Sequence, residues 1–573
     1  MKYKTERELN RDFLLRDGDY TSNRDVIERV ARYIPDKNLL ADLDENKEIR
    51  YYTAQDIYKY VEAIGSGLIE MGLEGKHIVI SAGNSVRYVL CDIAISGIGV
   101  VTPIDCDATP ELLTTLLNKC DADAIICNAS MVEKIKEIQP NVEKLQTIIT
   151  IDEKVEDYTS LDEVIAKGKE EGVTGKYLDR ELDLDKPAKI LFTSGTTGPN
   201  KAVVLTQRNI AANIINCMDT IKADDDSKNT SMSVLPMHHA TELNTHIFAR
   251  IASGRLTYIN DHMKNMMVNI KIFKPYVITI VPMIANVFYK TIWINAKKAG
   301  KAEKLKKGIK LCNLMKKLRI DLTHKLFKEV FAPFGGNLKQ IVCGGAMLNP
   351  ETVKGMCDLG IFISNGYGIT ECGPLISMNT DTINDCKSVG IQCPNQTVKL
   401  DEMNADGVGE LCVKGDSIAQ GYYKDEEATK EVFDEDGYFH TGDLAYFDGD
   451  KIVLAGRKKY VIILENGKNV CPEEIENEIS NNIEYATDFV VYMDEFGKDR
   501  TGICLGLYIE DEEIRNNRAK IKEDLQQLNK TLPVYKNVNY VNIVDAPFPK
   551  TSTRKIKRDA ESINHNKENG IIL

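Results

Sequence analysis

Apolar residues between positions 53 and 206 follow two alternating patterns. Some recur every three or four residues, starting after Thr53, which we expect to cap a helix together with Asp56. Others form short continuous runs that predict buried strands. The expected strands lie at 77–80, 99–103, 124–127, 147–151, 189–192 and 202–205, and the expected helices start at 53, 86, 110 and 206. Strands that alternate with helices predict a mostly parallel α/β sheet.

The pattern changes twice further along the chain. Four more strands are expected at 231–236, 277–282, 340–343 and 362–364, and a lysine-rich helical stretch at 287–335. From about residue 395 the sequence becomes β-like and rich in turns, and after 456 it consists of short αβ units. We therefore predict an α/β protein. Its large N-terminal domain, residues 1–455, combines α/β subdomains with a β-rich part, and a small mobile C-terminal α+β lid occupies 456–573. Residues 1–50 are polar and give no clear prediction.

Bulk properties narrow the range of functions. A chain of 573 residues exceeds one ordinary domain, and its net charge of −13 argues against nucleic acid as a partner. The fourteen cysteines include no CxxC pair, so we expect buried free thiols, among them Cys343, Cys412 and Cys471, in a reducing cytoplasm. No apolar signal region follows Met1. The apolar segments at 93–104 and 277–289 are shorter than the about 20 residues that span a bilayer, which leaves peripheral membrane contact open.

The loop after the 189–192 strand is the strongest candidate for chemistry. It consists of hydroxyl residues and glycines followed by a lysine: Thr193, Ser194, Gly195, Thr196, Thr197, Gly198 and Lys201. Glycines let backbone N–H groups approach a ligand, and hydroxyls and a positive charge suit phosphate oxygens. The spacing is not that of a Walker A loop, in which Ser or Thr follows the lysine. We interpret the loop as a triphosphate cradle of another kind, in preference to a polar surface hairpin.

Other polar or glycine-containing stretches also follow expected strands. They are His238-His239, Gly344-Gly345 and the stretch from Tyr367 to Glu371. Ligands of open α/β sheets bind at the carboxyl ends of the strands, so these features together indicate ATP with magnesium. Each feature alone is weak evidence. The glycines also fit a tight turn, Tyr367 a core residue and Asp443 a turn aspartate.

Five motifs in a fixed order carry a family resemblance, which covers residues 52–558. They lie at 192–201, 367–371, 438–443, 456–459 and 549–555. With these motifs the chain resembles the adenylate-forming (AMP-binding) superfamily, most of all its long-chain fatty acyl-CoA synthetases. The resemblance implies that a carboxylate attacks the α-phosphate of ATP, giving an acyl-adenylate and pyrophosphate. The thiol of coenzyme A then displaces AMP. Both steps depend on charge neutralisation more than on acid–base catalysis.

The resemblance also implies roles for residues around the nucleotide. Thr193 to Gly198 and Lys201 would hold the β- and γ-phosphates, and Thr370 would touch the α-phosphate. Mg²⁺ would bind Glu371, with Thr196 as a second ligand. Asp443 would accept hydrogen bonds from both ribose hydroxyls, assisted by Arg457. The residues implied around the adenine are Gly345, Ala346, Asn365, Gly366, Tyr367 and Gly368.

Further implied roles concern the lid. Lys555 would bridge the carboxylate and the α-phosphate during adenylation. Lys459 would be the hinge about which the lid rotates, so that the stretch 465–468, including Gly467, lines the thiol channel in the second step. Arg554 stands where the family usually has glycine, so Lys550 and Lys557 remain rivals for the catalytic role, and a solvated basic tail is the plain alternative. Tyr460 replaces a common acidic residue.

Two stretches indicate which carboxylic acid the protein would activate. The segment from Leu235 to Leu243 has no aspartate to hold a substrate amine and resembles the long-chain synthetase pattern. His239 in this segment has three open roles: a general base, a positioning or gating residue, and a buried structural histidine. The helical insertion between Pro282 and Gly344 resembles that of fatty-acid-activating members, where it would lengthen an apolar tunnel. Its lysines fit a solvated helix face, and the alternative is that they meet an anionic surface such as lipid head groups or a cofactor phosphate. We therefore favour a medium- or long-chain fatty acid.

Alternatives to this function stay open. The enzyme would instead load the phosphopantetheine of an acyl carrier protein, or activate an aromatic or other acid. A binding protein that keeps the fold without turnover is a third option. Lys201, Glu371, Asp443 and Lys555 are all present, which argues against that third option.

Overall fold

The computed structural model describes residues 4–5, 14–193, 200–223, 229–318, 320, 322–346, 348–380, 385–464, 469–496, 500–550, 556, 558 and 570–573. The chain divides into two compact units. The first comprises Met1–Thr193, Ala202–Val398 and Val413–Phe439, and the second comprises Ser194–Lys201, Lys399–Cys412 and His440–Leu573. The predicted boundary between residues 455 and 456 separates a mobile lid from the rest of the chain. A division by packing does not test mobility, so this boundary stays a prediction.

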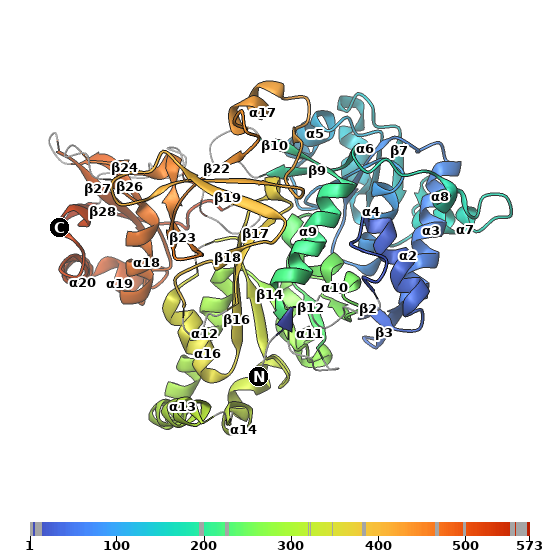
Figure 1. Cartoon of the computed structure of the whole chain (residues 1–573). Helices are drawn as coiled ribbons and strands as arrows, with labels where there is room; N and C mark the ends of the chain where they lie inside the picture. The colour runs from blue at the N-terminus through green and yellow to red at the C-terminus, as the bar shows by residue number, and fades with distance from the viewer. Residues whose placement is uncertain are drawn as a thin grey trace. The chain divides into compact units, whose positions relative to one another are not determined.

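The first unit contains an eight-stranded sheet in the order β21-β10-β9-β5-β4-β6-β7-β8. Its strands β7, β9 and β10 are labelled in Figure 1. Its strands are β4 (His77–Ser81), β5 (Val100–Pro103), β6 (Ala124–Cys127), β7 (Thr147–Thr150), β8 (Thr159–Ser160), β9 (Pro187–Thr193), β10 (Lys201–Thr206) and β21 (Gly421–Tyr422). β4 to β9 pair in parallel, which confirms the predicted α/β pattern. The helices between them are α3 (Ala54–Glu70), α4 (Val86–Ser96), α5 (Pro110–Lys119), α6 (Val132–Ile138), α7 (Leu161–Gly168), α8 (Lys176–Asp179) and, after β10, α9 (Gln207–Thr220).

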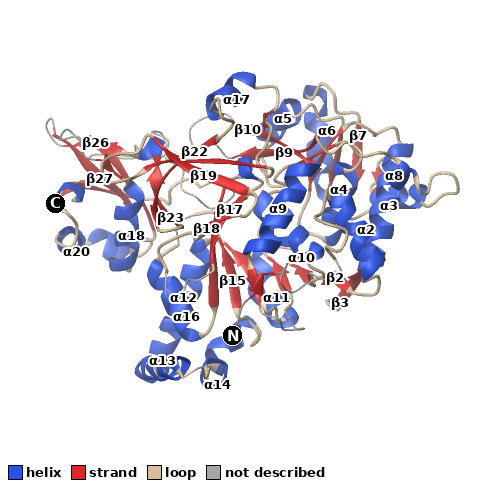
Figure 2. Ribbon diagram, in the orientation of Figure 1, coloured by secondary structure: helices blue, strands red, loops and turns tan. Residues whose placement is uncertain are grey.

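A nine-stranded sheet in the same unit has the order β18-β17-β16-β15-β14-β12-β13-β2-β3. Its strands are β2 (Asn38–Leu43), β3 (Ile49–Thr53), β12 (Ser231–Ser233), β13 (Thr257–Ile259), β14 (Val277–Ile280), β15 (Gln340–Cys343), β16 (Phe362–Gly368), β17 (Leu375–Asn379) and β18 (Ile391–Gln392). Its helices are α2 (Asn23–Tyr33), α10 (Phe248–Ala252), α11 (Met266–Phe273), α12 (Pro282–Lys298), α13 (Ala302–Lys317), α14 (Thr323–Leu326), α15 (Lys328–Phe331) and α16 (Pro350–Leu359). α12 and α16 pack together beside β16 (Figure 2).

Helix α3 shows how the sequence pattern becomes a core. Thr53 and Asp56 form the predicted capping box, and the apolar residues from Ile57 to Leu68 at helical spacing are fully buried. A Cβ atom on Gly65 would lie 2.2 Å from the ring of Tyr177, so only glycine lets this buried ring pack against the helix.

One stretch has no prediction, and two differ from theirs. The polar N-terminal region forms α2, β2 and β3, with α2 capped by Ser22. β12 ends at Ser233 instead of Pro236, because the side chain of Asn84 forms hydrogen bonds with the backbone there. It donates to the Leu235 carbonyl and accepts from the Met237 N–H. β16 continues through Gly368 instead of ending at 364, because antiparallel β17 pairs with the extension.

The second unit contains most of a four-stranded sheet, β19 (Gln396–Asp401), β20 (Gly409–Gly415), β22 (Phe439–Asp448) and β23 (Lys451–Arg457). A hairpin of β24 (Ile462–Ile463) and β25 (Asn469–Val470) and then an α+β part follow. This part comprises α18 (Pro472–Asn482), β26 (Asp488–Phe496), β27 (Arg500–Tyr508), α19 (Glu512–Asn516), α20 (Arg518–Asn529), β28 (Tyr540–Val544) and β29 (Gly570–Ile572), packed around one apolar cluster. The β-rich region after 395 and the αβ texture after 456 are thus confirmed.

The cysteines agree with the expectation of buried thiols. The structure describes all fourteen, and none of them forms a disulfide. Cys343, Cys412 and Cys471 are buried as expected. Within the described part of the chain, no helix has the length and apolar character needed to cross a membrane.

Candidate active site

Most of the predicted site residues of the first unit follow strands of the nine-stranded sheet at one edge, whereas Thr193 ends β9 in the eight-stranded sheet. β12, β14, β15 and β16 are adjacent and parallel, so their carboxyl ends emerge at the same edge. Ile280, Cys343 and Asn365 are aligned across three of these strands. The chain segments that follow the four strands contain the histidine pair, Pro282, the glycine pair and Thr370-Glu371. Three of the four expected features thus follow strands that end at one edge of this sheet, and open α/β sheets bind ligands at such an edge.

The residues expected around the adenine belong to two neighbouring strand ends. Gly344, Gly345 and Ala346 follow β15, whereas Asn365, Gly366, Tyr367 and Gly368 lie within β16. Gly345 has φ of +89°, which favours glycine, and a Cβ atom on Gly368 would lie 2.0 Å from the Pro374 carbonyl oxygen. Gly345 is thus favoured by its positive φ, and Gly368 by the close approach of the Pro374 carbonyl. The role of these residues at the adenine stays a prediction.

The turn after β16 holds Glu371 through a hydrogen bond. Thr370 and Glu371 form a short 3₁₀ turn, and the Tyr422 hydroxyl donates to Glu371 Oε1 at 3.1 Å. Burial, together with the Glu371 carboxylate, raises the pKa of Tyr422 far above its ordinary value, so the hydroxyl remains a donor. The Glu371 carbonyl accepts from the Ala419 N–H at 2.8 Å. Sequence reasoning missed Tyr422, because 51 positions separate it from Glu371.

The histidine pair follows β12 in a loop that Asn84 fixes. Asn84 donates to the Leu235 carbonyl at 2.8 Å and accepts from the Met237 N–H at 2.9 Å. The rings of His238 and His239 lie 4.1 Å apart between centroids. Burial lowers the pKa of His238 to about 4, so this imidazole is neutral at pH 7.

A π-helix, Thr241–Ile247, begins directly after the histidine loop. Within it, Glu242 Oε1 and His246 Nδ1 lie 2.9 Å apart, and both side chains are buried. Glu242 Oε2 also accepts from the Leu235 N–H at 3.3 Å. π-helical turns are rare and frequently occur at functional sites. The sequence analysis did not single out Glu242 or His246, although their four-residue spacing, which places them on one helical face, was a usable signal.

The phosphate loop is described only at its ends. Thr193 ends β9 and Lys201 begins β10. Ser194, Gly195, Thr196, Thr197 and Gly198 lie outside the described residues, as do Lys555 and the stretch 465–468 with Gly467. The predictions for these residues stay predictions.

In the second unit, Asp443 and Arg457 face each other on adjacent strands. They are paired in register between β22 and β23, and Arg457 Nε lies 2.7 Å from Asp443 Oδ1. The Asp443 N–H donates to Thr441 Oγ1, whose hydroxyl donates to the Leu411 carbonyl at 2.7 Å. The structure thus brings together the two residues expected at the ribose and fixes their strand through Thr441.

Two lysines of the second unit lie close to this pair. Burial lowers the pKa of Lys459, and the positive charges of Arg457 and Lys201 lower it further, while Asp443 opposes the shift. Lys459, Lys201 and the Asp443–Arg457 pair therefore interact electrostatically. This grouping is consistent with a surface that binds a polyanion.

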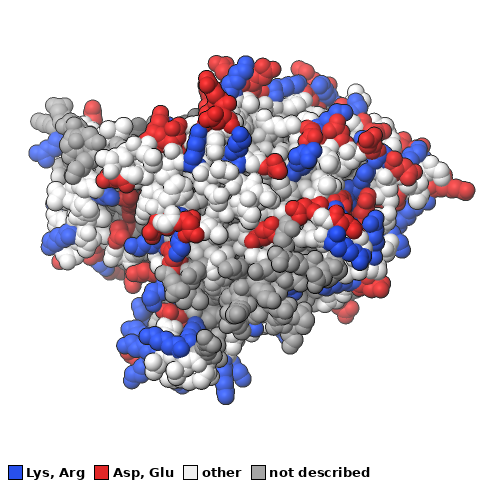
Figure 3. Space-filling view, in the orientation of Figure 1, with Lys and Arg blue, Asp and Glu red and all other residues white. Residues whose placement is uncertain are grey.

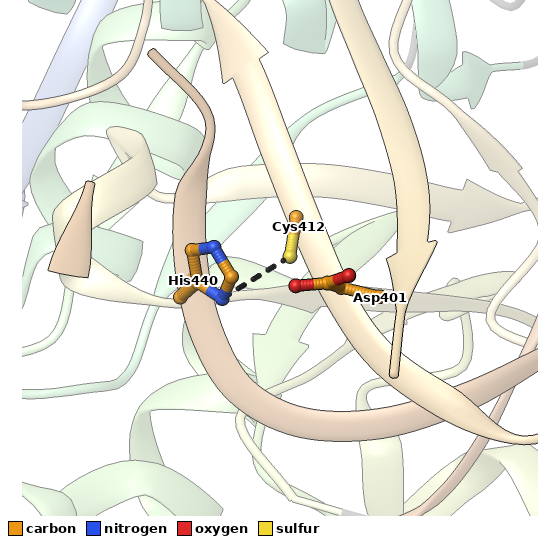
Figure 4. Close-up of side chains that lie close together, drawn as sticks. All are labelled: Asp401, Cys412 and His440. Carbon is orange, nitrogen blue, oxygen red and sulfur yellow. Dashed lines mark hydrogen bonds between the residues drawn. The ribbon is translucent and has the colours of Figure 1, made fainter. Parts of the chain in front are cut away.

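A further cluster supports the same strands. Asp401, Cys412 and His440 lie close enough to share a metal ion, with His440 Nδ1 3.5 Å from Cys412 Sγ (Figure 4). However, the same nitrogen lies 3.3 Å from Glu410 Oε2, and the Lys458 ammonium lies 2.9 Å from that oxygen. Since an ammonium already balances Glu410, we interpret the cluster as a hydrogen-bond network that fixes β20 against β22.

Two residues of the basic segment 550–558 form ion pairs within the second unit. Lys550 Nζ lies 2.7 Å from Asp488 Oδ1, and Arg558 Nη2 lies 2.5 Å from Glu476 Oε2. Lys550, one rival for the catalytic role, is thus engaged in an ion pair, whereas Lys557 lies outside the described residues.

Comparison with known proteins shows the family of the chain. A family model described as "AMP-binding enzyme" matches residues 27–423. The chain belongs to the AMP-binding enzyme family. Among curated members, the peroxisomal long chain acyl-CoA synthetase 6 of Arabidopsis thaliana is 27% identical over 540 residues, which is 84% of this chain and 76% of that protein. The predicted resemblance to adenylate-forming enzymes, and among them to long-chain acyl-CoA synthetases, is confirmed.

Solved structures show the same fold at lower identity. ATP-bound MatB from Rhodopseudomonas palustris has a TM-score of 0.73 at 20% identity, covering 94% of this chain and 98% of its own. The adenylation domain of a carboxylate reductase from Mycobacterium chelonae has a TM-score of 0.76 at 20% identity, covering 93% and 88%. The AMP-binding fold is therefore shared with enzymes that differ in substrate.

Proposed function

We propose that the protein is a fatty acid–CoA ligase that acts through an acyl-adenylate. A carboxylate oxygen of a medium- or long-chain fatty acid attacks the α-phosphorus of ATP, and the bond to pyrophosphate breaks. The sulfur of coenzyme A then attacks the acyl carbon, and AMP leaves. The observation that carries the proposal is the sheet edge of the AMP-binding fold, where the glycine pair and Glu371 lie at adjacent strand ends.

The described residues fit ATP and Mg²⁺. Glu371 offers a carboxylate oxygen, the kind of ligand that Mg²⁺ prefers, and its Oε1 accepts a hydrogen bond from the neutral hydroxyl of Tyr422. Asp443 offers acceptors for ribose hydroxyls, and Gly345 has open space where a Cβ atom would stand. We assign Mg²⁺ to Glu371, with Thr196 as the second ligand, and the ribose to Asp443 and Arg457. When bound, Mg²⁺ would neutralise phosphate charge during adenylation.

The fatty acid is supported by the loop after β12. A substrate amine needs a carboxylate partner, and this loop instead presents His238 and His239, of which His238 is neutral at pH 7. Two acidic side chains lie nearby: Glu242 is buried against His246, and Asp105 Oδ2 lies 3.9 Å from His238 Nε2. The names of the curated relatives also support a fatty acid. We assign His239 a positioning role near the acyl group.

The lid carries the second part of the proposal. We assign Lys555 to the adenylation step, Lys459 to the hinge and Gly467 to the thiol channel, following the family pattern at these positions. Lys555→Ala should then abolish adenylation but spare thioester formation from supplied acyl-adenylate. Equal loss of both half-reactions would remove Lys555 from this role.

The experiment is ATP–pyrophosphate exchange with saturated fatty acids of graded length and with benzoate, with CoA consumption measured in parallel. We expect exchange with medium or long chains and consumption of free CoA. Exchange with benzoate alone would contradict the proposal that the substrate is a fatty acid. Exchange with fatty acids, but thioester formed only on a carrier-protein phosphopantetheine, would overturn CoA as the acceptor. No exchange with any acid would favour a binding protein without turnover.

A further inference from the structure

The helical insertion carries a strong positive charge in an acidic chain. Between Lys297 and Lys317 there are nine lysines and one glutamate, whereas the whole chain has a net charge of −13. This segment includes the end of α12 and all of α13. Figure 3 shows Lys and Arg side chains gathered over α13, with uncharged atoms exposed between them. The local charge is therefore opposite to that of the molecule as a whole.

Helix α13 has one buried and one exposed face. Leu305 and Cys312 are buried against the apolar cluster of the nine-stranded sheet. On the opposite side, Leu311, Leu314 and Leu318 are 47%, 58% and 65% exposed. Their spacing of three and four residues aligns them in one stripe along the helix. Isolated exposed leucines are ordinary, but three aligned on one outer face form a patch that an interaction would cover.

Lysines border this stripe without being neutralised. Lys304 and Lys307 continue the line of the leucines toward the start of the helix, and Lys310 and Lys317 lie beside it. The nearby acidic groups are engaged elsewhere: Glu303 with Lys306 at 2.9 Å, and Glu329 with Lys301 at 2.7 Å. Among the described residues, no ion pair is formed by Lys307, Lys310 or Lys317. Three of the four bordering lysines are thus free to meet an external anionic surface.

We infer that this face of α13 docks the protein on an anionic lipid bilayer. Leu311, Leu314 and Leu318 would enter the boundary between head groups and acyl chains, and the bordering lysines would contact anionic head groups, as in interfacial helices. A small soluble anion would leave the leucines exposed, so the combination favours lipid. The inference does not rest on the proposed function, because binding is measured without ATP, acid or CoA.

The experiment is flotation of the full chain with vesicles of phosphatidylcholine alone, or with about 30% phosphatidylglycerol, whose charge attracts lysines. The wild type should float with anionic vesicles, partition at least about tenfold less onto neutral ones, and be released as salt screens the charges at about 0.5 M. A wild type that does not float with anionic vesicles would overturn the inference.

Two variants separate charge from insertion. The triple change Lys304→Glu, Lys307→Glu and Lys310→Glu should weaken anionic binding at least about tenfold. The triple change Leu311→Ser, Leu314→Ser and Leu318→Ser should also weaken it severalfold, because the apolar contact is lost. If the serine variant binds anionic vesicles like the wild type, the leucines do not enter the bilayer, and the inferred insertion of this face is wrong.

A matched control makes the same charge change on another helix. Lys520→Glu, Lys522→Glu and Lys530→Glu alter three exposed lysines in or directly after α20. This variant should float like the wild type. If this control lost as much vesicle binding as the α13 charge variant, net charge alone would govern binding. That result would contradict the assignment of the docking face to α13. All the altered side chains are exposed, so an unchanged circular dichroism spectrum is expected for each variant.

Discussion

Two carboxylates that we assign to ATP have partners of different kinds. Glu371 accepts a hydrogen bond from the neutral hydroxyl of Tyr422 at 3.1 Å, whereas Asp443 is paired with the guanidinium of Arg457 at 2.7 Å. A hydroxyl leaves the negative charge of a carboxylate intact, and a guanidinium balances it. The Tyr422 hydroxyl thus adds no positive charge to Glu371, whereas Arg457 adds one to Asp443. We assign Glu371 to the metal ion and Asp443 to the ribose hydroxyls.

The largest effect is expected for Glu371→Gln. Glutamine keeps the shape and can still accept the hydrogen bond from Tyr422, but it lacks the charge that a divalent ion needs. Pyrophosphate exchange should fall about 100- to 1,000-fold, which corresponds to about 3–4 kcal/mol of lost charge stabilisation. The measurement is the exchange rate at saturating ATP and magnesium.

A matched control for this change is Glu427→Gln on α17 (Glu426–Val432), where the side chain is exposed. It removes the same charge from the same unit and should leave the exchange rate within about twofold, as surface changes usually do. If Glu371→Gln retained a third of the wild-type rate, the contrast between the two carboxylates would lose its basis.

A third group near the sheet edge loses its charge through burial. His238 has a pKa of about 4, below the ordinary 6.5, because burial disfavours its charged form. Between these values the unfolded chain binds a proton that the folded chain does not. The free energy of unfolding should therefore fall as pH drops from 6.5 toward 4, with about 2 kcal/mol lost by pH 5.

His238→Asn should remove this acid dependence, because asparagine does not titrate. Urea unfolding at pH 7.5 and pH 5 measures it, with exposed His262→Asn as the control that keeps the wild-type slope. An unchanged slope in His238→Asn would show that this histidine is charged when folded.

For Asp443→Asn we expect a smaller effect of a different kind. Asparagine can still accept a hydrogen bond from one ribose hydroxyl but not from two, so KM for ATP should rise about tenfold, with kcat changing little. Asp448→Asn, an exposed change on the same strand β22, is the control. A fall in kcat at unchanged KM would place Asp443 in the chemical step and contradict a role at the ribose.

The smallest effect is expected for Tyr422→Phe. Losing one hydrogen bond to Glu371 should raise the magnesium concentration for half-maximal exchange about three- to fivefold. Because the pKa of Tyr422 is raised far above its usual range, its hydroxyl stays protonated, and the ratio of wild-type to variant activity should be constant from pH 7 to pH 10. A ratio that falls to one near pH 10 would mean that the hydroxyl ionises.

Much of the fold could be predicted because its signals are local. The apolar runs of β4 to β10 and the capping box of α3 depend on residues within a few positions of one another. The elements that were missed depend on distant partners. Asn84, whose side chain binds the chain after β12, lies 151 positions before its partner Leu235. β17 pairs with β16 beyond the apolar run of β16 and so extends that strand. Helix α2 is polar and makes contacts that its own sequence does not predict. One example is the hydrogen bond from the Asn23 N–H to the side chain of Gln207.

The site divides in the same way. Glu371, Asp443 and Arg457 could be named from motifs, and the structure adds what each one contacts. Tyr422, Glu242 and His246 carry no motif, and their roles appear only when the strands and the π-helix bring their partners within hydrogen-bond distance. Motifs thus identify the groups that meet the ligand, and the structure identifies the groups that hold them.

The most direct test of the central claim is ATP–pyrophosphate exchange in the absence of CoA, with a long-chain fatty acid and with wild type and Glu371→Gln side by side. An acyl-adenylate mechanism predicts exchange that requires the fatty acid, proceeds without CoA and falls at least about 100-fold in the variant. Exchange that requires CoA, or that is equal in the two proteins, would contradict the account.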